Sequence, residues 1–295
     1  MTDVASGLHH PAGSLADGDW STILTPETAG WRFCGLRGAT LSAGGSLTFD
    51  SGSDEVIVLP LAGSVAVEVD RASYRLRGRA SVWDGPSDFV YAPPASALAL
   101  SSEEGARVAI ATARTDGERR FPVRYVTSDD VAVELRGGGA CSREVRNFAA
   151  AHRFEADRLI AVEVLTPGGN WGSYPPHKHD EVRDGETELE EIYHYIVADG
   201  PSGPGLAYQH IYGTPGRPID LLTTVATGDT VLVPHGWHGP AMAAPGYDLY
   251  YLNVMAGPGE RAWRACDDPA HVWVKDGWAG QGTDPRLPFG KYARP

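Results

Sequence analysis

The sequence predicts an all-β protein made of two consecutive β-barrel or jelly-roll modules with few, short helices. First, glycine (36) and proline (22) are abundant among the 295 residues, and so many turn-forming residues do not suit long helices. Second, short apolar segments recur roughly every ten residues, a spacing typical of sandwiches and barrels. Third, apolar residues make up 42% of the chain, so we expect it to fold around a core rather than stay disordered.

The N-terminal half supplies the first series of predicted strands. Within residues 64–70, Val65, Val67 and Val69 alternate with small or polar residues, as on a strand with one buried face. Gly63 and similar turn residues separate the segments, which favours antiparallel strands over βαβ units. The strands expected in this half cover residues 55–61, 64–70, 73–77, 87–93 and 106–112.

A charged stretch around residues 114–153 separates the two series, and Arg136-Gly-Gly-Gly-Ala140 is its clearest break. Within it, residues 121–126 are a candidate strand and residues 142–151 are the best candidate helix. The β pattern resumes in residues 159–165, 191–197, 207–212, 221–226, 230–234 and 248–255. We therefore predict an N-terminal module (18–120), a linker (121–156), a C-terminal module (157–257) and an irregular tail (258–295).

Charge and composition limit the partners and the location. The net charge is −13, which argues against nucleic acid and anionic membranes as main partners. No apolar run approaches the roughly 18 residues of a spanning helix, and residues 1–18 lack the apolar segment of a signal peptide. Cys34, Cys141 and Cys266 are scattered and odd in number, which favours free thiols in a reducing compartment. We expect a cytoplasmic protein.

Histidines concentrate in one part of the chain and predict a metal site. His177 and His179 form a His-x-His pair, and because side chains alternate along a strand, both imidazoles project from the same face. A divalent metal accepts two such nitrogens, and a carboxylate and a third imidazole from neighbouring strands complete four protein ligands. Positions on the metal can then remain open for a substrate.

Two later segments supply the remaining candidate ligands. Glu191 begins the strand pattern Glu-Ile-Tyr-His-Tyr, in which His194 faces the other side. Glu190 is the alternative carboxylate, and we prefer Glu191 because it is in phase with the inward face. His238 ends the motif Gly228-x5-Pro234-x-Gly236-x-His238. A single His-x-His is more often an ordinary pair of polar strand residues, but the three pieces together predict a metal bound by His177, His179, Glu191 and His238.

These pieces match the two motifs of the cupin superfamily, and longer segments resemble the 5-deoxy-glucuronate isomerase family of bacterial inositol catabolism. In the C-terminal half the resemblance is dense and rests on Glu163–Trp171, Ser173–Asp180, Leu189–Tyr193, Gly228–His238, Ala244–Tyr247, Tyr250–Gly257 and Asp268–Trp273. In the N-terminal half it is thinner and rests on Val82–Asp88 and Tyr91–Pro94. Position 172 departs from the family, with glycine where serine is expected, well away from the predicted ligands. The related 4-deoxy-5-ketouronate isomerases have a shorter spacing between the histidine pair and the glutamate.

The resemblance implies an aldose–ketose isomerase that converts 5-deoxy-D-glucuronate to 5-dehydro-2-deoxy-D-gluconate. It implies a bicupin with one divalent metal ion, whose identity among Zn, Mn, Fe, Ni and Co stays open. The N-terminal module has neither metal motif, and His9 and His10 lie in a terminus that we expect to be loose. The first module should therefore be metal-free and structural.

The isomerisation requires either a base that carries a proton between C2 and C1 or a hydride shift. The candidate bases are Glu163, Lys178, Tyr251 and, less favoured, Glu190. Glu163 interrupts an apolar strand, so we expect it on a solvated face or in a polar cavity. Lys178 lies between the two histidines and should point away from the metal. One of Tyr250 and Tyr251 should reach the cavity.

A uronic acid substrate requires polar and cationic side chains. Gln209 and Asn253 are candidate hydroxyl-binding groups, and a satisfied buried amide is an equal alternative for each. The substrate carboxylate requires a cation. We expect Arg183, in the acidic loop, or Arg261, after the last predicted strand, to supply it.

Two other functions would use a similar fold and site. An iron-dependent cupin dioxygenase has a similar set of three histidines and one glutamate with open coordination positions. A non-catalytic sugar-binding cupin is the third interpretation, and it typically loses ligands or carries a DNA-binding domain. Exposed strand edges would also allow a homo-oligomer.

Overall fold

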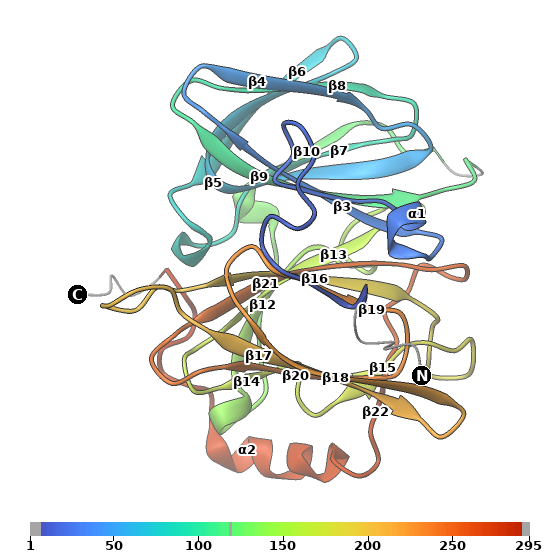
Figure 1. Cartoon of the computed structure of the whole chain (residues 1–295), viewed down its shortest axis with the longest axis vertical. Coiled ribbons are helices and arrows are strands. Elements are labelled where there is room, and N and C mark those ends of the chain that lie inside the picture. The colour runs from blue at the N-terminus through green and yellow to red at the C-terminus, as the bar shows by residue number, and fades with distance from the viewer. Residues whose placement is uncertain (1–6, 118–119, 291–295) are drawn as a thin grey trace.

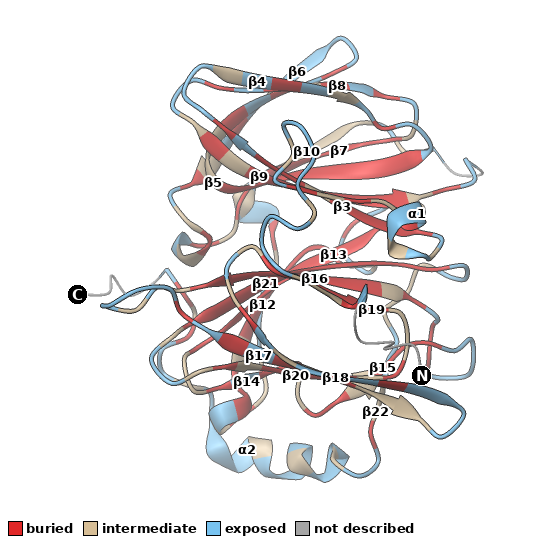
Figure 2. Cartoon of the chain, in the orientation of Figure 1, coloured by how far each residue is buried: buried red, intermediate tan, exposed pale blue. Residues whose placement is uncertain are grey.

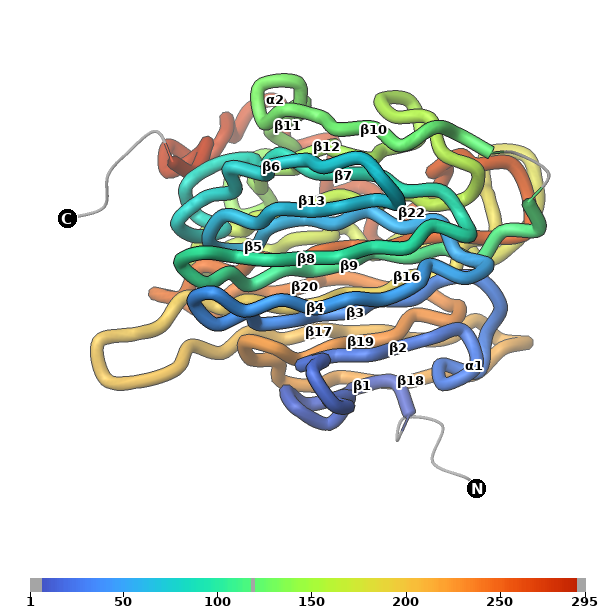
Figure 3. Tube along the Cα trace, turned by 90° about the horizontal axis from the view of Figure 1, so that it is seen from above, coloured from blue at the N-terminus to red at the C-terminus, as the bar shows by residue number. Residues whose placement is uncertain are grey.

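The computed structural model describes residues 7–117 and 120–290 and confirms the prediction of an all-β fold with few short helices. The strands of these residues form three sheets, which group into two modules that lie one above the other (Figure 1). We call the nine-stranded sheet the N-terminal module, and the seven- and six-stranded sheets together the C-terminal module. Seen from above, the strands of both modules run in nearly the same direction (Figure 3).

The N-terminal module contains the strands predicted in the first half, with one difference. Residues 55–61 and 64–70 belong to a single strand, whose register shifts between Pro60 and Ala62 and again after Gly63. Gly63 has φ +80°, and a Cβ there would lie 2.3 Å from a backbone oxygen, so this glycine permits a bend instead of ending the strand. The strands of the sheet are β2 Thr22–Leu24, β3 Cys34–Leu41, β4 Gly45–Asp50, β5 Asp54–Val69, β6 Ala72–Arg79, β7 Phe89–Ala92, β8 Ala97–Ser102, β9 Ala106–Arg114 and β10 Arg124–Val126.

The C-terminal module is a sandwich of two sheets. The seven-stranded sheet has the order β1-β19-β16-β21-β13-β12-β11. Its strands are β1 His9–His10, β11 Val133–Arg136, β12 Arg143–Ala149, β13 Ile160–Thr166, β16 Glu190–Val197, β19 Thr230–Val233 and β21 Leu249–Ala256. The six-stranded sheet consists of β14 Trp171–Gly172, β15 His177–Lys178, β17 Ala207–Thr214, β18 Arg217–Val225, β20 Trp237–Ala243 and β22 Cys266–Asp267.

The segment between the two predicted modules is mostly extended. Strand β10 pairs with β7, which agrees with a strand within residues 121–126. The helix predicted at residues 142–151 is wrong, because Arg143–Ala149 form β12, paired with β11 and β13. Its side chains Val145 and Phe148 are both buried, so burial in the sheet outweighs the local helix preference.

The helices of the described residues are short. They are α1 Pro26–Ala29, η2 Val82–Asp84, η3 Ser128–Asp130, η4 Gly139–Cys141, η5 Val272–Gly277 and α2 Trp278–Gln281, where η denotes a 3₁₀ helix. None of them is long and apolar enough to cross a bilayer. The segment predicted as an irregular tail thus contains β22, η5 and α2, and its residues 291–295 lie outside the described part.

The expectation of a loose N-terminus at His9 and His10 is wrong. These residues form β1 and pair with Val231 and Thr230 of β19. Nε2 of His9 lies 2.9 Å from the carboxylate of Asp229, so the N-terminal segment is attached to the edge of the C-terminal module. Residues 1–6 lie outside the described part.

Buried side chains form three clusters that define the layers of the molecule (Figure 2). Aliphatic residues such as Val56, Val58 and Ile110 fill the interior of the N-terminal module. A second cluster lies between the modules, where Leu59 and Ala111 pack near Ile192 and Leu252. The third fills the C-terminal sandwich, and the candidate site lies within that module.

Candidate metal centre and substrate cavity

The C-terminal module brings the predicted ligands together from both of its sheets. His177 lies on β15 opposite His238 of β20, and His179 follows two residues later. Glu191 lies on β16 of the seven-stranded sheet. The carboxylate of one sheet and the imidazoles of the other therefore meet inside the sandwich.

Three histidines form the cluster, and the carboxylate of Glu191 lies against two of them. Nitrogens of His177, His179 and His238 lie within 4.8 Å of one another. Oε2 of Glu191 is 3.0 Å from Nε2 of His179 and 3.0 Å from Nε2 of His238. Nε2 of His238 is buried and makes no hydrogen bond with the described residues. Because buried polar atoms are normally satisfied, this convergence fits a bound metal ion, and three imidazoles with one carboxylate form a suitable donor set.

Contacts behind the cluster orient its side chains. Nδ1 of His238 donates to the carbonyl of Gly236 at 3.1 Å, which leaves Nε2 unprotonated on the inner side. Burial, followed by repulsion from the other two histidines, lowers the pKa of His177 well below its usual value. Burial alone would raise the pKa of Glu191, but the adjacent imidazoles of His179 and His238 outweigh it and hold that pKa at about 2. His177 is therefore neutral and Glu191 ionised, as metal ligands must be.

Lys178 points away from the cluster, and its position does not support the predicted role as a base. Its Nζ lies 2.6 Å from Asp180 and 2.8 Å from Glu186. Burial would lower the pKa of Lys178, but these carboxylates outweigh it and raise that pKa. Asp180 also accepts the backbone N–H of Gly236 at 2.9 Å. These contacts of Lys178 and Asp180 thus connect the segment of His177 and His179 to the segment of His238.

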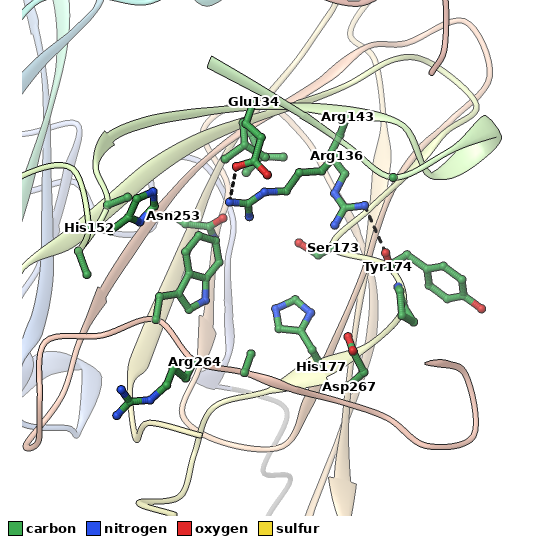
Figure 4. A pocket seen from close by; sticks show the side chains of 18 of the residues that line it. Glu134, Arg136, Arg143, His152, Ser173, Tyr174, His177, Asn253, Arg264 and Asp267 are labelled. Atoms are coloured by element: carbon green, nitrogen blue, oxygen red, sulfur yellow. Dashed lines mark hydrogen bonds and ion pairs between the residues drawn. The ribbon is translucent and has the colours of Figure 1, made fainter. Parts of the chain in front are cut away.

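A cavity of about 840 Å³ lies beside His177. Figure 4 shows side chains of this cavity, which project into it from several elements. Those that matter for the chemistry discussed below are His177, Ser173, Tyr193, Tyr251, Asn253 and Arg143. The structure thus brings three predicted residues, Tyr251, Asn253 and Arg261, into the lining of one cavity with a predicted ligand.

Tyr251 has a specific environment in the cavity. Its hydroxyl lies 2.9 Å from Oγ of Ser173, which is also 3.3 Å from the hydroxyl of Tyr193. Burial raises the pKa of Tyr251 to about 12, although Ser173 and Arg143 act in the opposite direction. Ser173 has φ +47°, an uncommon backbone conformation for a residue with a side chain. Of the pair Tyr250 and Tyr251, Tyr251 is thus the one that reaches the cavity.

The glycine at position 172 is closer to the chemistry than the sequence suggested. A Cβ placed on Gly172 would lie 2.8 Å from the hydroxyl of Tyr251 and 2.6 Å from Oγ1 of Thr166. A serine here would require these groups to shift. The departure from the family pattern therefore coincides with space for the Tyr251 hydroxyl.

Glu163 does not lie on the cavity side of β13. Its carboxylate forms a buried ion pair with Arg79 of the N-terminal module and accepts the Tyr250 hydroxyl at 2.8 Å. Burial would raise the pKa of Glu163, but Arg79 and Arg146 outweigh it and lower that pKa. The face predicted to be solvated or catalytic is in fact an inter-module contact, so Glu163 is not a base for this site.

Glu190 also contacts the other module. Its carboxylate accepts the backbone N–H groups of residues 32–34 at 2.7, 2.8 and 2.9 Å. It therefore does not take part in the histidine cluster. The choice of Glu191, made from strand phase, agrees with this placement.

The predicted substrate-binding residues other than Asn253 are engaged elsewhere. Gln209 is fully buried and accepts the Tyr195 hydroxyl at 2.7 Å, as the satisfied-amide alternative anticipated. Arg183 is paired with Glu186 and Glu181. Arg261 lines the cavity, but its guanidinium donates to backbone carbonyls of residues 149, 151, 154 and 159.

Sequence reasoning missed Arg143, Ser173 and Tyr193 as cavity residues. Arg143 was hidden by the wrong helix at residues 142–151, because the inward face of a strand differs from that of a helix. Tyr193 shares the inward phase of Glu191 on the same strand, and that signal was available. Ser173 immediately precedes the stretch Tyr174-Pro-Pro-His177, but nothing in the sequence reveals its unusual backbone conformation.

An all-β sandwich with three histidines and one glutamate converging inside it defines a protein of the cupin class. Within that class, the chain belongs to the KduI/IolB family, which it matches over residues 8–274.

Known relatives agree with this assignment. The chain is 38% identical to the 5-deoxy-glucuronate isomerase of Geobacillus kaustophilus over 256 residues, which cover 86% of this chain and 90% of that protein. It also resembles the crystal structure of an IolB-like protein from Salmonella typhimurium, with a TM-score of 0.82 and 34% identity over 90% of this chain and 98% of that one. A Lactobacillus farciminis oxalate decarboxylase, at 11% identity, shares the fold alone, with a TM-score of 0.60 over 88% of each chain.

Proposed function

We propose that this chain is a metal-dependent aldose–ketose isomerase that converts 5-deoxy-D-glucuronate to 5-dehydro-2-deoxy-D-gluconate in inositol catabolism. The observation that carries the proposal is the convergence of His177, His179, Glu191 and His238 beside a cavity of about 840 Å³. A cavity of this size suits a small-molecule substrate. Relatives named 5-deoxy-glucuronate isomerase support the choice of substrate.

One divalent metal ion would be held by these four residues. When bound, it would act as a Lewis acid toward the aldehyde and C2 hydroxyl oxygens of the sugar. The donor set of nitrogen and oxygen atoms is compatible with Zn, Mn, Fe, Ni or Co.

The cavity residues would bind the sugar and hold a proton. Because burial raises the pKa of Tyr251 to about 12, its hydroxyl is protonated at neutral pH and can donate to a substrate oxygen. Ser173, 2.9 Å away, would orient that hydroxyl. Asn253 offers its amide to a sugar hydroxyl. Of the predicted bases, Tyr251 is the one that the cavity contains.

An isotope experiment separates proton transfer from a hydride shift. If a side chain carries the proton in exchange with solvent, turnover in deuterated water places deuterium on C1 of the ketose. Product without deuterium at C1 would contradict solvent-exchanged proton transfer and favour the hydride route. NMR of the isolated product measures this directly.

Metal analysis combined with an isomerase assay tests the proposal. The purified chain should contain close to one divalent ion and convert the uronic acid to its ketose. The double variant His177→Ala/His238→Ala should lose both. His210→Ala is the matched control, because His210 lies on β17, outside the histidine cluster, with Nε2 3.8 Å from the carboxylate of Asp220. Turnover retained by the metal-free double variant would rule out the proposed site.

The same purified protein distinguishes the alternatives. An iron-dependent dioxygenase would consume oxygen when substrate is added, whereas an isomerase would not. A non-catalytic sugar-binding cupin would bind the uronic acid and leave it unchanged. No observation on the described residues favours either alternative over the isomerase.

We also propose roles for the predicted modules and the cellular setting. The N-terminal module (18–120) would be metal-free and structural, because aliphatic side chains fill its interior. The three cysteines are free, which suits a reducing cytoplasm. We also propose that the chain forms a homo-oligomer. Light scattering after size-exclusion chromatography measures its oligomeric state.

A further inference from the structure

Five basic side chains line the cavity, and four of them already have partners. Arg136 pairs with Glu134 at 2.8 Å, Arg264 with Glu260 at 2.7 Å, and Lys275 with Asp267 at 2.6 Å. Arg261 donates to four backbone carbonyls. Carboxylates thus compensate the charge of three of these side chains, and backbone carbonyls occupy all three nitrogens of the fourth, Arg261.

Arg143, the fifth, differs from the others. It has no carboxylate partner among the described residues, and its hydrogen bonds come from one nitrogen, Nη1, to the carbonyls of Cys141 (3.1 Å) and Tyr174 (3.3 Å). The donors on Nε and Nη2 therefore have no acceptor within the described part of the chain. Figure 4 shows the guanidinium projecting into the cavity near Ser173 and Tyr174.

The surroundings of Arg143 hold the guanidinium in place and leave its charge uncompensated. The two carbonyl contacts fix its position at the start of β12, and the ring of Trp278 lies 5.8 Å from Cζ. Burial lowers the pKa of Arg143, and the nearby Arg136 acts in the same direction. A cation in such a setting favours an anion, because a partly buried charge without a counter-charge is costly.

The free donors have the geometry that a carboxylate requires. A guanidinium can present two parallel N–H groups to the two oxygens of a carboxylate, which adds strength and fixes orientation. Because Arg143 is anchored through Nη1, little side-chain freedom remains to be lost on binding. A neutral sugar offers no group that would compensate the charge equally well.

We propose that Arg143 binds the carboxylate of the uronate substrate and makes the enzyme selective for sugar acids over neutral sugars. This inference rests on the proposed isomerase function. The segment Ser173–His177 supports it, because it contributes a predicted metal ligand at one end and, at the other, the carbonyl of Tyr174 that anchors Arg143. The reactive end of the sugar would lie toward His177 and its carboxylate toward Arg143.

The net charge of the chain gives this residue added weight. At −13, the overall field repels an anionic substrate. Attraction must then come from local cations, and within the described part of the chain Arg143 is the cavity cation that has neither a carboxylate partner nor backbone acceptors for all of its nitrogens. Loss of this one charge should therefore reduce uronate turnover strongly.

A comparison of two substrates tests the proposal on the metal-loaded enzyme. The substrates are 5-deoxy-D-glucuronate and its uronamide, in which a carboxamide replaces the carboxylate. In Arg143→Met, kcat/KM for the uronate should fall on the order of 100-fold, as for loss of one partner of a close charge pair. The value for the uronamide should change little, so the preference between the substrates collapses. The control Arg75→Met, on the surface of the N-terminal module at 75% side-chain exposure, should keep the preference.

Two further measurements keep the test decisive if Arg143→Met is unstable or the uronamide is a poor substrate. Arg143→Lys keeps the charge but loses the fork, so its uronate turnover should lie between those of the wild type and the Met variant. In Arg143→Ala, added guanidinium ion should restore uronate turnover in a saturable way. Melting temperature and metal content should be close to wild type in the variants that are scored.

The outcomes separate this inference from the function on which it rests. A wild-type holoenzyme that does not isomerise the uronate would contradict the proposed function itself. A wild type that does so, together with an Arg143→Met variant that keeps both its uronate turnover and its preference for the uronate, would overturn only the role of Arg143. Loss of turnover on both substrates to the same extent, without rescue by guanidinium, would also overturn it.

Discussion

The two modules share a scaffold, and comparing them shows that a few inward side chains distinguish the candidate site from the corresponding part of the N-terminal module. At the start of β5, Glu55 accepts the backbone N–H groups of residues 157–159 at 2.9, 2.6 and 2.6 Å. At the start of β16, Glu190 accepts those of residues 32–34. Each module thus holds the other through one carboxylate on an equivalent strand. We call these two sets of contacts the reciprocal clamps.

Counting from the clamps relates individual positions of the two interiors. Glu191, next to Glu190, corresponds to Val56, next to Glu55. Asn253 lies opposite the residue two positions after Glu191 on β16. It corresponds to Ile110, which lies opposite the residue two positions after Val56 on β5. The same inward positions hold aliphatic side chains in one module and polar groups of the site in the other. The chemistry therefore depends on a few inward side chains rather than on the fold.

We expect the largest effect when Glu191 is replaced by valine, the residue at the corresponding position of the N-terminal module. Glu191→Val should lose the bound metal and reduce isomerase turnover below detection, because among the described residues no other carboxylate oxygen lies 3.0 Å from both His179 and His238. Metal analysis and the uronate assay measure both effects. Full metal content in this variant would show that the carboxylate is not a ligand.

The reverse exchange should destabilise the protein without creating a site. Val56→Glu places a carboxylate in an aliphatic interior where Val56 is 1% exposed. Without a partner, such a charge should lower the free energy of unfolding by about 3–5 kcal/mol. Urea denaturation measures this, with Val56→Ala as the control for lost packing. A gain of bound metal would contradict the view that the first module is purely structural.

The fold class, and the grouping of the histidines with Glu191, could be predicted from the sequence because both depend on local periodicity. His177 and His179 share a face by alternation, and Glu191 was preferred over Glu190 by the same argument. The same alternation of side chains predicts that Lys178 points away from the histidine cluster. Each of these inferences needs only the geometry of one strand.

Contacts between distant strands could not be predicted in the same way. Glu163 was known to interrupt an apolar strand, but its partner Arg79 lies 84 residues earlier in the chain. Arg261 was expected to be free for a ligand, and backbone carbonyls around residue 150 occupy it instead. Whether a charged side chain is available for a ligand depends on such contacts, which no sequence pattern encodes.

A further difference between the modules concerns the layer between them and predicts a pH effect. His194 is the position that corresponds to Leu59, and it is 8% exposed with Nδ1 3.0 Å from Oγ1 of Thr230. Burial, and then repulsion by Arg107, lowers the pKa of His194 to about 4. Below pH 6.5 the unfolded chain should therefore bind a proton at His194, whereas the folded protein should bind that proton only near pH 4. Stability should fall as the pH drops through this window, by about 3 kcal/mol in total.

The variant His194→Leu gives this position the residue of the N-terminal module and tests that effect. The difference in unfolding free energy between variant and wild type should shift in favour of the variant from pH 6.5 to pH 4. Urea unfolding at several pH values measures it, and the difference cancels the carboxyl groups that titrate in both proteins. A difference that does not change with pH would show that His194 has the same pKa in the folded protein as in the unfolded chain.

The smallest expected effect tests whether the reciprocal clamps act together. Glu55→Gln and Glu190→Gln each weaken three charge-assisted hydrogen bonds from backbone N–H groups, and each should cost about 2 kcal/mol of stability. The two clamps are adjacent, because Ala113 of β9 pairs both with Glu55 and with Cys34, whose N–H binds Glu190. Loosening one clamp should therefore release part of the other, so the double variant should lose less than the sum of the single variants. Urea unfolding of all four proteins gives this coupling. A strictly additive loss would show that each carboxylate stabilises its own strand and that the modules are not docked by a shared contact.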